Sequence, residues 1–270
     1  MPRAKVCADA KNQGFRVVSL VPSLTEALVI LGGRVMLVGR TRFCTHPAFT
    51  LRHVQSVGGT KNPDLSTILR LNPDLILASK EENRKEDVES LVKAGLFVRV
   101  SQAENPHEAF SELEEIKNLL GLTDPRGLAW NALRAYERLR RQAQHTRPVR
   151  TLCLVWKEPF VAVGSSTYAG SLMEAARLQS CLKGRYPRLT VEDLTSLNPG
   201  LVLLPDEPYP FGPRDAMELR SIFERAGKPI PPIRLFRGRN LFWPGLRAPF
   251  GLRALLSQPY LRERDKFKTR

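Results

Sequence analysis

The sequence has 270 residues, of which 42% are hydrophobic and 26% charged, as in an ordinary soluble globular protein. A chain of this length buries roughly three-quarters of its unfolded surface, enough for one large domain or two lobes without disulfides. It contains no unbroken apolar run of 18 residues, and its four cysteines have no CxxC spacing. The sequence therefore predicts neither a membrane-spanning helix nor a disulfide framework.

The net charge of +15 permits contact with nucleic acid, with an anionic membrane or with an acidic small ligand. Much of it lies in arginines at residues 134–150 and in a basic segment at residues 262–270. No helix-turn-helix, zinc-finger or aromatic-interleaved RNA motif accompanies these residues. We therefore interpret them as a solvated surface and expect no nucleic-acid partner.

The first half of the chain alternates between strand and helix patterns. Ser23 and Glu26 have the spacing of a capping box, and Pro106 and Glu108 follow a capping asparagine, Asn105. The predicted elements are a strand at 16–21, a helix at 23–31, a strand at 35–38, a loop at 39–62, a helix at 84–94, a strand at 96–100 and helices beginning at 105 and 124. The last of these would run some 20 residues, on the order of 30 Å, to Pro148.

A similar sequence segment occurs in both halves of the chain. LNPDLIL at residues 71–77 returns as LNPGLVL at residues 197–203, too far apart for a solenoid repeat. In each copy Pro disfavours helical geometry at the preceding Asn, and an apolar run suited to a strand buried on both faces follows. The repeat predicts two similar α/β lobes, and clefts between lobes are common ligand sites.

After Pro148 the alternation restarts. The predicted elements are strands at 151–155 and 160–163, a helix at 169–178, the second repeat copy, a helix at 214–226, a strand at 233–236 and a helix at 251–257. The expected organisation is an α/β lobe at 16–122, a long backbone helix at 123–147 and a second α/β lobe at 148–257.

The segments 18–26, 57–59, 71–77, 186–187 and 197–199 together resemble the class III, or helical-backbone, binding proteins for cobalamin and ferric siderophores. The stretches 80–84 and 205–211 resemble a soluble branch of that family, the helical-backbone metal receptors. The resemblance implies two Rossmann-like lobes joined by one long helix, with a metal chelate held in the cleft between them. It implies a binding protein rather than an enzyme, without a resident cofactor and most simply a monomer.

By motif, the resemblance also implies ligand contacts, which lie in loops that follow strands. They are Pro22, Ser23, Phe43, Gly59, Thr60, Lys80, Glu81 and Asn83 in the first lobe, and Ser165, Ser166, Tyr186, Tyr209, Phe211, Phe242, Trp243 and Arg247 in the second. Aromatic side chains in Pro-rich loops suit a flat corrin or catecholate ring, and Arg247 suits an anionic chelate. The alternative for the aromatic residues is packing on their own lobe.

Transport members of the family carry in each lobe an exposed Glu that docks on an ABC permease. Glu192 occupies the second-lobe position, but Ser66 stands in the first. The N-terminal residues lack the apolar stretch of an export signal, so we expect a cytoplasmic protein, or a periplasmic one if the start site is misassigned. A cytoplasmic carrier or sensor without a permease is therefore the alternative function.

A metal-dependent enzyme is the less favoured alternative. Cys44, His46 and His53 are the only metal-like cluster, and Glu81 with Glu82 could act as an acid and base pair. However, Cys44, His46 and His53 are not accompanied by a second pair of ligand residues at the spacing of a metal site. The side chains of adjacent glutamates do not face each other. We therefore expect no metal site and no catalytic residues.

Overall fold

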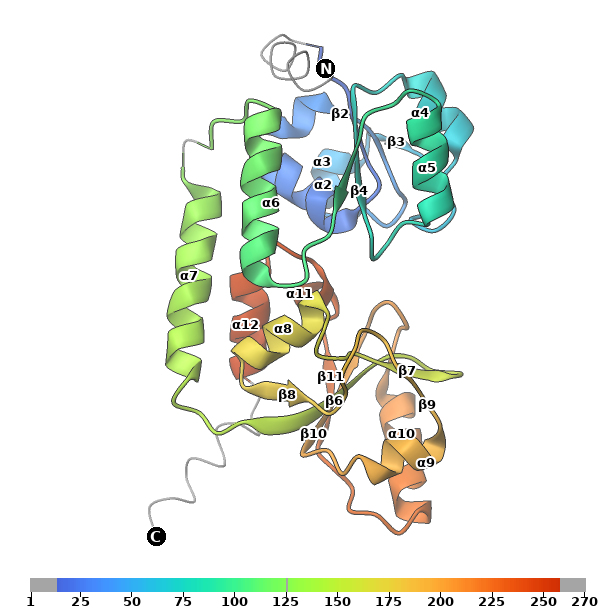
Figure 1. Ribbon diagram of the computed structural model, residues 1–270, viewed down its shortest axis with the longest axis vertical. Coiled ribbons are helices and arrows are strands. Elements are labelled where there is room, and N and C mark those ends of the chain that lie inside the picture. Colours follow the sequence, from blue (N-terminus) through green and yellow to red (C-terminus); the bar gives the residue numbers. More distant parts are fainter. Residues whose placement is uncertain (1–13, 125, 258–270) are drawn as a thin grey trace. The chain divides into compact units, whose positions relative to one another are not determined.

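The computed structural model describes residues 14–124 and 126–257, which form two compact units. The first unit contains the described residues up to Ala103, with His107–Asn131 and Pro244–Leu246. The second contains Glu104–Pro106, Ala132–Trp243 and the described residues from Arg247 onward. Each unit has its own sheet (Figure 1). Two α/β lobes were predicted from the repeat, and this fold class is confirmed, whereas the exact domain boundaries stay predictions.

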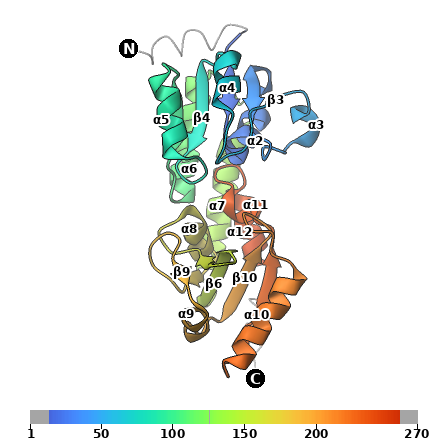
Figure 2. The same cartoon turned by 90° about the vertical axis from the view of Figure 1, so that its right-hand side faces the viewer.

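The first unit is built on a parallel five-stranded sheet in the order β3-β2-β1-β4-β5. Its strands are β1 (Val17–Ser19), β2 (Leu37–Arg40), β3 (Gln55–Ser56), β4 (Leu75–Ser79) and β5 (Val98–Ser101). Its helices are α2 (Pro22–Ile30), the short 3-10 helix η1 (Gly33–Met36), α3 (Ala48–Leu51), α4 (Leu65–Leu71), α5 (Lys85–Lys93) and α6 (Pro106–Leu119). Figure 2 shows α3 beyond the edge strand β3.

Alternate residues of the central strands supply two cores in this unit. Val17 and Leu77 pack with Leu28 of α2 and Ile116 of α6 on one face. The neighbouring Ile76 packs on the other face, where α4 and α5 contribute one buried residue each. Because both faces are covered, the run from Leu75 to Ala78 is buried without interruption.

The second unit has a six-stranded mixed sheet in the order β11-β10-β6-β7-β9, with β8 also paired to β6. Its strands are β6 (Val149–Trp156), β7 (Phe160–Ala162), β8 (Leu178–Ser180), β9 (Arg188–Leu189), β10 (Leu201–Pro205) and β11 (Ile233–Phe236). Its helices are α8 (Tyr168–Ala175), α9 (Val191–Ser196), α10 (Pro213–Arg225), α11 (Arg239–Phe242) and α12 (Ala248–Leu256). Leu194 of α9 and Phe223 of α10 pack with β6 and β10, and Figure 2 shows α10 running beside β10.

The sequence repeat is a structural repeat. Asp64 caps α4 by accepting the Thr67 backbone N–H at 3.0 Å, and Thr190 caps α9 by accepting the Asp193 N–H at 3.1 Å. Each helix then reaches an Asn in the left-handed region, with φ of 43° at Asn72 and 46° at Asn198. The following strands, β4 and β10, each lie between two parallel neighbours. The predicted helix-strand unit is therefore confirmed in both copies.

Two predictions near the N-terminal end of the first unit were wrong. Helix α2 begins at Pro22, with Val21 as its N-cap and no side-chain capping bond, so Ser23 lies inside the helix and is not half of a capping box. Proline suits the first helical position because its missing N–H would have no partner there. The second strand begins at Leu37 instead of residue 35, because η1 occupies Gly33–Met36.

The second of the two consecutive helices is shorter than predicted. It is α7 (Leu128–Ala143), 16 residues long, and it does not start at Asp124. Asp124 instead accepts the backbone N–H groups of Leu128 at 2.8 Å and Ala129 at 3.0 Å. Its carboxylate therefore caps the first N–H groups of α7, although Asp124 lies about one turn before the helix begins. The short elements α3, β3, β8, β9 and α11 were not predicted, since two to four residues carry no usable periodicity. None of the helices within the described ranges is long and apolar enough to cross a membrane.

Candidate functional site

In the first unit, the candidate residues lie at one edge of the sheet, Pro22 and Ser23 buried in the first turn of α2 and the others in loops. All five strands are parallel, so the loops that follow them leave the same edge. Pro22 and Ser23 follow β1, Phe43 follows β2, Gly59 and Thr60 follow β3, and Lys80, Glu81 and Asn83 follow β4. The structure thus places all eight predicted first-unit residues at the carboxyl edge.

Asn83 ties three of these loops together. Its side-chain N–H groups donate to the carbonyls of Thr60 at 3.0 Å and Leu20 at 3.3 Å, and its Oδ1 accepts the Ser79 backbone N–H at 2.8 Å. The residue is only 6% exposed. Because both ends of the amide are occupied, Asn83 positions the loops of this edge, and its role as a ligand contact stays a prediction.

A buried polar cluster lies beside the start of α2. The Thr25 hydroxyl lies 2.8 Å from Ser19 Oγ and 3.0 Å from Cys44 Sγ, and Thr41 Oγ1 lies 3.2 Å from the same sulfur. All four side chains are fully buried. Burial raises the pKa of the Cys44 thiol, while the threonine hydrogen bonds act in the opposite direction. The cluster joins the ends of β1 and β2 and holds Cys44 as a neutral thiol.

The loop after β2 exposes an aromatic ring. Phe43 is 50% exposed, and the Arg42 guanidinium lies 5.0 Å from the centroid of its ring. Arg42 also donates its backbone N–H to the Gly58 carbonyl at 2.8 Å, which binds this loop to the one after β3. In that loop a Cβ on Gly59 would lie 2.3 Å from Asn62 Oδ1, so a side chain cannot be accommodated without moving Asn62. Phe43 is therefore an exposed ring on a fixed loop.

Lys61 is a residue at this edge that the motif comparison missed. Its Nζ donates to the Glu81 carbonyl at 2.9 Å, and burial lowers its pKa, opposed by the nearby Glu82. It joins the β3 and β4 loops, while the predicted Lys80 beside it is exposed. The only sequence feature that could have indicated Lys61 is its position in a Gly-rich loop, and that feature is weak.

In the second unit, Ser165, Ser166 and Tyr186 come together. The Ser165 and Ser166 backbone N–H groups donate to the carbonyls of Leu182 at 3.0 Å and Gly184 at 2.8 Å. A Cβ on Gly164 would lie 2.3 Å from the Gly184 carbonyl oxygen, so the two segments pack backbone to backbone. Both serines are exposed, and Tyr186 is 38% exposed. These side chains are available to a ligand.

A second group in this unit follows β10 and β11. The indole N–H of Trp243 donates to the Glu207 carboxyl, and the Arg247 guanidinium lies 5.2 Å from the centroid of the Trp243 rings. Burial raises the pKa of Glu207, as does the Asp206 charge, whereas the Trp243 hydrogen bond and the charges of Arg239 and Arg247 oppose the shift. Trp243 is 6% exposed and Phe242 is partly buried. This group combines a buried carboxyl with two guanidinium groups.

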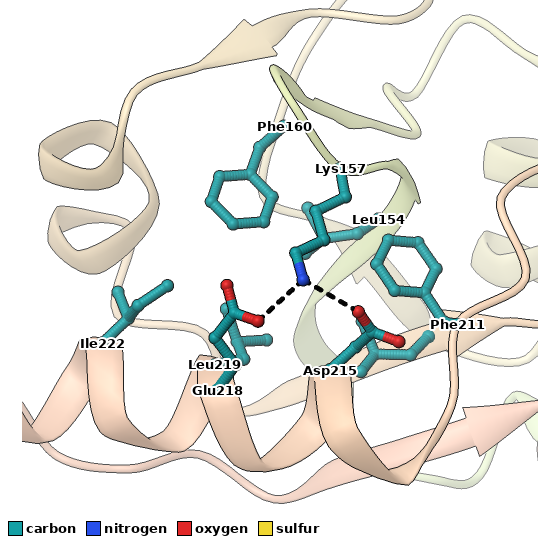
Figure 3. Close-up of a pocket in the computed structure, with 9 residues that line it drawn as sticks. Leu154, Lys157, Phe160, Phe211, Asp215, Glu218, Leu219 and Ile222 are labelled. Carbon is teal, nitrogen blue, oxygen red and sulfur yellow. Dashed lines mark hydrogen bonds and ion pairs between the residues drawn. The ribbon is translucent and has the colours of Figure 1, made fainter.

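Phe211 and Tyr209 were expected to contact a ligand, but Phe211 belongs to the core of the second unit. It is 5% exposed, and its ring centroid lies 4.6 Å from that of Tyr209, which in turn meets Trp156 edge to face at 5.7 Å. Phe211 and Phe160 flank Lys157, whose Nζ lies 3.0 Å from Asp215 Oδ1 and 2.7 Å from Glu218 Oε2 (Figure 3). The lysine charge is matched by two carboxylates, so this small pocket is a structural contact.

The residues proposed for a metal site do not assemble into one. Cys44 is enclosed by threonines, His46 Nδ1 lies 3.0 Å from the Thr45 hydroxyl, and His53 Nε2 accepts from Arg52 at 2.7 Å. Within residues 14–124 and 126–257, no three His, Cys, Asp or Glu side chains are placed to hold a metal ion. The arrangement gives no support to the metal-enzyme alternative.

The two helices on which the resemblance predicts docking glutamates differ in charge. On α9 Glu192 is exposed next to Asp193. On α4 the Ser66 hydroxyl donates to Asp64 Oδ1 at 2.7 Å and accepts from Arg70 at 3.2 Å. The first-unit helix therefore presents a serine and an arginine where the second presents carboxylates.

The chain matches known proteins over most of its length. A family model described as periplasmic binding protein matches residues 17–207. Over 191 residues, which are 68% of both chains, the sequence is 23% identical to a vitamin B12-binding protein of Vibrio vulnificus strain YJ016.

Solved structures agree with the family match at the level of the fold. The periplasmic vitamin B12 binding protein BtuF of Vibrio cholerae superposes with a TM-score of 0.75 and 18% identity, covering 93% of this chain and 98% of its own. A periplasmic heme binding protein from Pseudomonas aeruginosa gives a TM-score of 0.73 and 23% identity, covering 92% of each chain. The family model and the two-unit α/β fold lead to one conclusion: the chain belongs to the periplasmic binding protein family.

Proposed function

We propose that this chain is a substrate-binding protein for a metal chelate: a corrinoid such as cobalamin, a ferric siderophore or a heme. The observation that carries the proposal is the group after β10 and β11, where Arg247 stacks on Trp243 and Trp243 is bonded to Glu207. A guanidinium fixed on an aromatic ring binds carboxylate and other anionic groups with little loss of side-chain freedom. Relatives named for vitamin B12 and heme binding support the same ligand class.

The ligand contacts that we propose in the first unit are Phe43, Thr60, Lys80 and Glu81. Phe43 offers an exposed ring, and Asn83 and Gly59 keep its neighbouring loops in place. In the second unit we propose Ser165, Ser166, Tyr186, Phe242 and Arg247. A largely pre-formed set of loops is typical of small-molecule sites, since ordering loops on binding would cost affinity.

Absorbance titration tests the proposal, because corrinoids, hemes and ferric catecholates are coloured. We expect one of these chelates to shift its spectrum on addition of the protein, and Arg247→Ala or Phe43→Ala to weaken its binding at least about tenfold. Arg214→Ala, an exposed residue of α10, is the matched control and should leave the affinity unchanged. If no chelate class changes its spectrum with folded protein, the proposal is wrong.

A cytoplasmic carrier or sensor that works without a permease is the second candidate. The observation that favours it is Ser66, which occupies the position of a docking carboxylate on α4. Affinity capture of the tagged chain from cells grown on the bound chelate separates the two functions. Co-capture of an ABC permease that is lost in Glu192→Lys supports the transport receptor, and capture without any permease supports the carrier.

A further inference from the structure

One carboxyl group of the second unit is partly buried, and one of its oxygens has no hydrogen bond. Glu207 follows β10, and its Oε1 is a buried atom without a hydrogen-bond partner. Such an atom destabilises the fold, more so when its group is charged than when it is neutral. A glutamine could accept the Trp243 N–H equally well, so the indole contact does not require a charge here.

The backbone holds this carboxyl in place. A Cβ on Gly238 would lie 2.3 Å from Glu207 Cγ, so the loop after β11 can pack on Glu207 only because residue 238 is glycine. The Gly238 N–H donates to Asp206 Oδ1 at 2.6 Å, and the Asp206 N–H donates to the Phe236 carbonyl at 3.0 Å. The loops after β10 and β11 are thus fixed to each other, and Gly238 packs directly against the Glu207 side chain.

The charged groups that act on Glu207 come from three places. Asp206 belongs to its own loop, Arg239 is the first residue of α11, and Arg247 precedes α12. Two carboxylates therefore face two guanidinium groups. The group is neutral when both acids are ionised and carries one positive charge when Glu207 is protonated.

We propose that Glu207 selects the charge of the chelate: its carboxylate disfavours anionic ring chelates, and its protonation favours them. This inference rests on the proposed function and names a property of the same site. Neutral chelates should not respond, because a change of charge at Glu207 acts on the charge of the ligand. Buried carboxyls that keep a charge without needing it for packing are found at functional sites.

The test uses two pairs of chelates that differ in charge but not in ring. One is cyanocobalamin with its monocarboxylate, in which one peripheral amide is hydrolysed, and the other is hemin with its dimethyl ester, which lacks the propionate charges. For the ring class that binds, wild type should bind the carboxylate member progressively more tightly as the pH is lowered from 8 through the raised pKa of Glu207. Glu207→Gln should bind it about tenfold more tightly than wild type at pH 8, as expected for one screened charge. The variant should also lose that pH dependence.

The matched control is Glu224→Gln. Glu224 is exposed near the C-terminal end of α10, which lies at the opposite edge of the sheet from the end of β10, and its replacement removes the same charge. Glu224→Gln should bind both members of each pair with the same affinity and pH dependence as wild type. Any pH dependence that remains in both variants comes from titration of the ligand itself.

Three outcomes overturn the inference. Equal changes for both members of a pair in Glu207→Gln would mean a purely structural role. If that variant does not fold, wild type alone gives the test. The inference is then overturned if the ratio of its affinities for the two members of a pair does not change with pH. If wild type binds neither pair, this inference fails, and the proposed function fails with it only if ferric siderophores are also unbound.

Discussion

Asn83 illustrates how one side chain sets the shape of a binding edge. Its amide joins the loops after β1, β3 and β4, and it makes these bonds while almost fully buried. Asn83→Ala would leave one backbone N–H and two carbonyls without partners. We expect the free energy of unfolding to fall by about 1–3 kcal/mol, measured by urea unfolding followed by circular dichroism.

The exposed Lys80 provides the control for this substitution. Lys80→Ala should change stability by less than about 0.5 kcal/mol, because it breaks no buried contact. An Asn83→Ala protein as stable as wild type but unable to bind a chelate would contradict the positioning role and make Asn83 a ligand contact.

Cys44 is expected to be chemically inert in the folded protein. Its thiol is fully buried, and burial raises its pKa, so the reactive thiolate is scarce at neutral pH. Burial raises the pKa of Cys153 as well. We expect Ellman's reagent at pH 8 to leave both residues unlabelled for as long as the chain is folded, whereas all four cysteines react in guanidinium. Rapid labelling of Cys44, mapped by peptide mass, would reopen its assignment as a ligand to metal.

At the scale of elements, Lys157 fixes the turn after β6 to α10. Its ammonium and Asp215 are each 16% exposed, and Glu218 completes the contact (Figure 3). Both carboxylates raise the pKa of Lys157. For Asp215 burial alone would raise the pKa, but the Gly212 N–H and Lys157 lower it overall. We expect Lys157→Met to reduce stability by about 1–2 kcal/mol at pH 7, more than a surface pair contributes.

The pH dependence of this contact follows from the two shifts. The contribution of Lys157 is complete below the ordinary lysine pKa and is lost as pH rises through its raised value. The contribution of Asp215 is complete above the ordinary carboxyl pKa and is lost as pH falls through its lowered value. The difference between wild type and Lys157→Met should thus shrink at strongly acid pH. Lys85→Met removes a well-exposed ion pair and should cost almost nothing, and an equal cost for both would refute the assignment.

The two copies of the repeat should respond alike to the same substitution. Asn72 and Asn198 are exposed residues with positive φ, where Asn and Gly are tolerated better than other residues. We expect Asn72→Ala and Asn198→Ala each to cost about 1 kcal/mol. The glycine variants at both positions should stay within about 0.5 kcal/mol of wild type. Unequal costs, measured by thermal unfolding, would argue against equivalent helix ends.

Elements with a strong sequence pattern could be predicted, and those fixed by distant contacts could not. The buried strands β4 and β10 were evident because the Pro and the apolar run that follows it lie within one segment. The same holds for α10 and β11. Helix α2 began one residue early because Pro22 competes with Ser23 for the same helix start. In these cases local chemistry decided the outcome.

Site residues were harder to assign, because their roles depend on partners far along the chain. The amide of Asn83 is occupied by Leu20 and Thr60, which no local pattern reveals. Phe211 lies in a Pro-rich loop, yet it packs in the core with residues of β6 and α10. Glu207 is enclosed only because residue 238 is glycine. The supporting roles of these side chains could be seen only in the structure, and the ligand contacts stay predictions.

At the scale of the whole molecule, each unit repeats the same plan of a buried sheet with functional loops after its strands. The family match extends over residues 17–207, and relatives of this fold include proteins named for vitamin B12 and heme binding. The net charge of +15 would attract an anionic chelate from solution, an effect that salt weakens. These features are consistent with the proposed capture of a small ligand, and within the described residues no cluster of His, Cys, Asp or Glu is placed to hold a metal ion.

The measurement that tests this account most directly is gel filtration of the chain with cyanocobalamin, hemin or a ferric catecholate siderophore, monitored at protein and chelate wavelengths. The account predicts that one of these chelates elutes with the protein at one molecule per chain. Elution of every chelate free of a folded protein would contradict it.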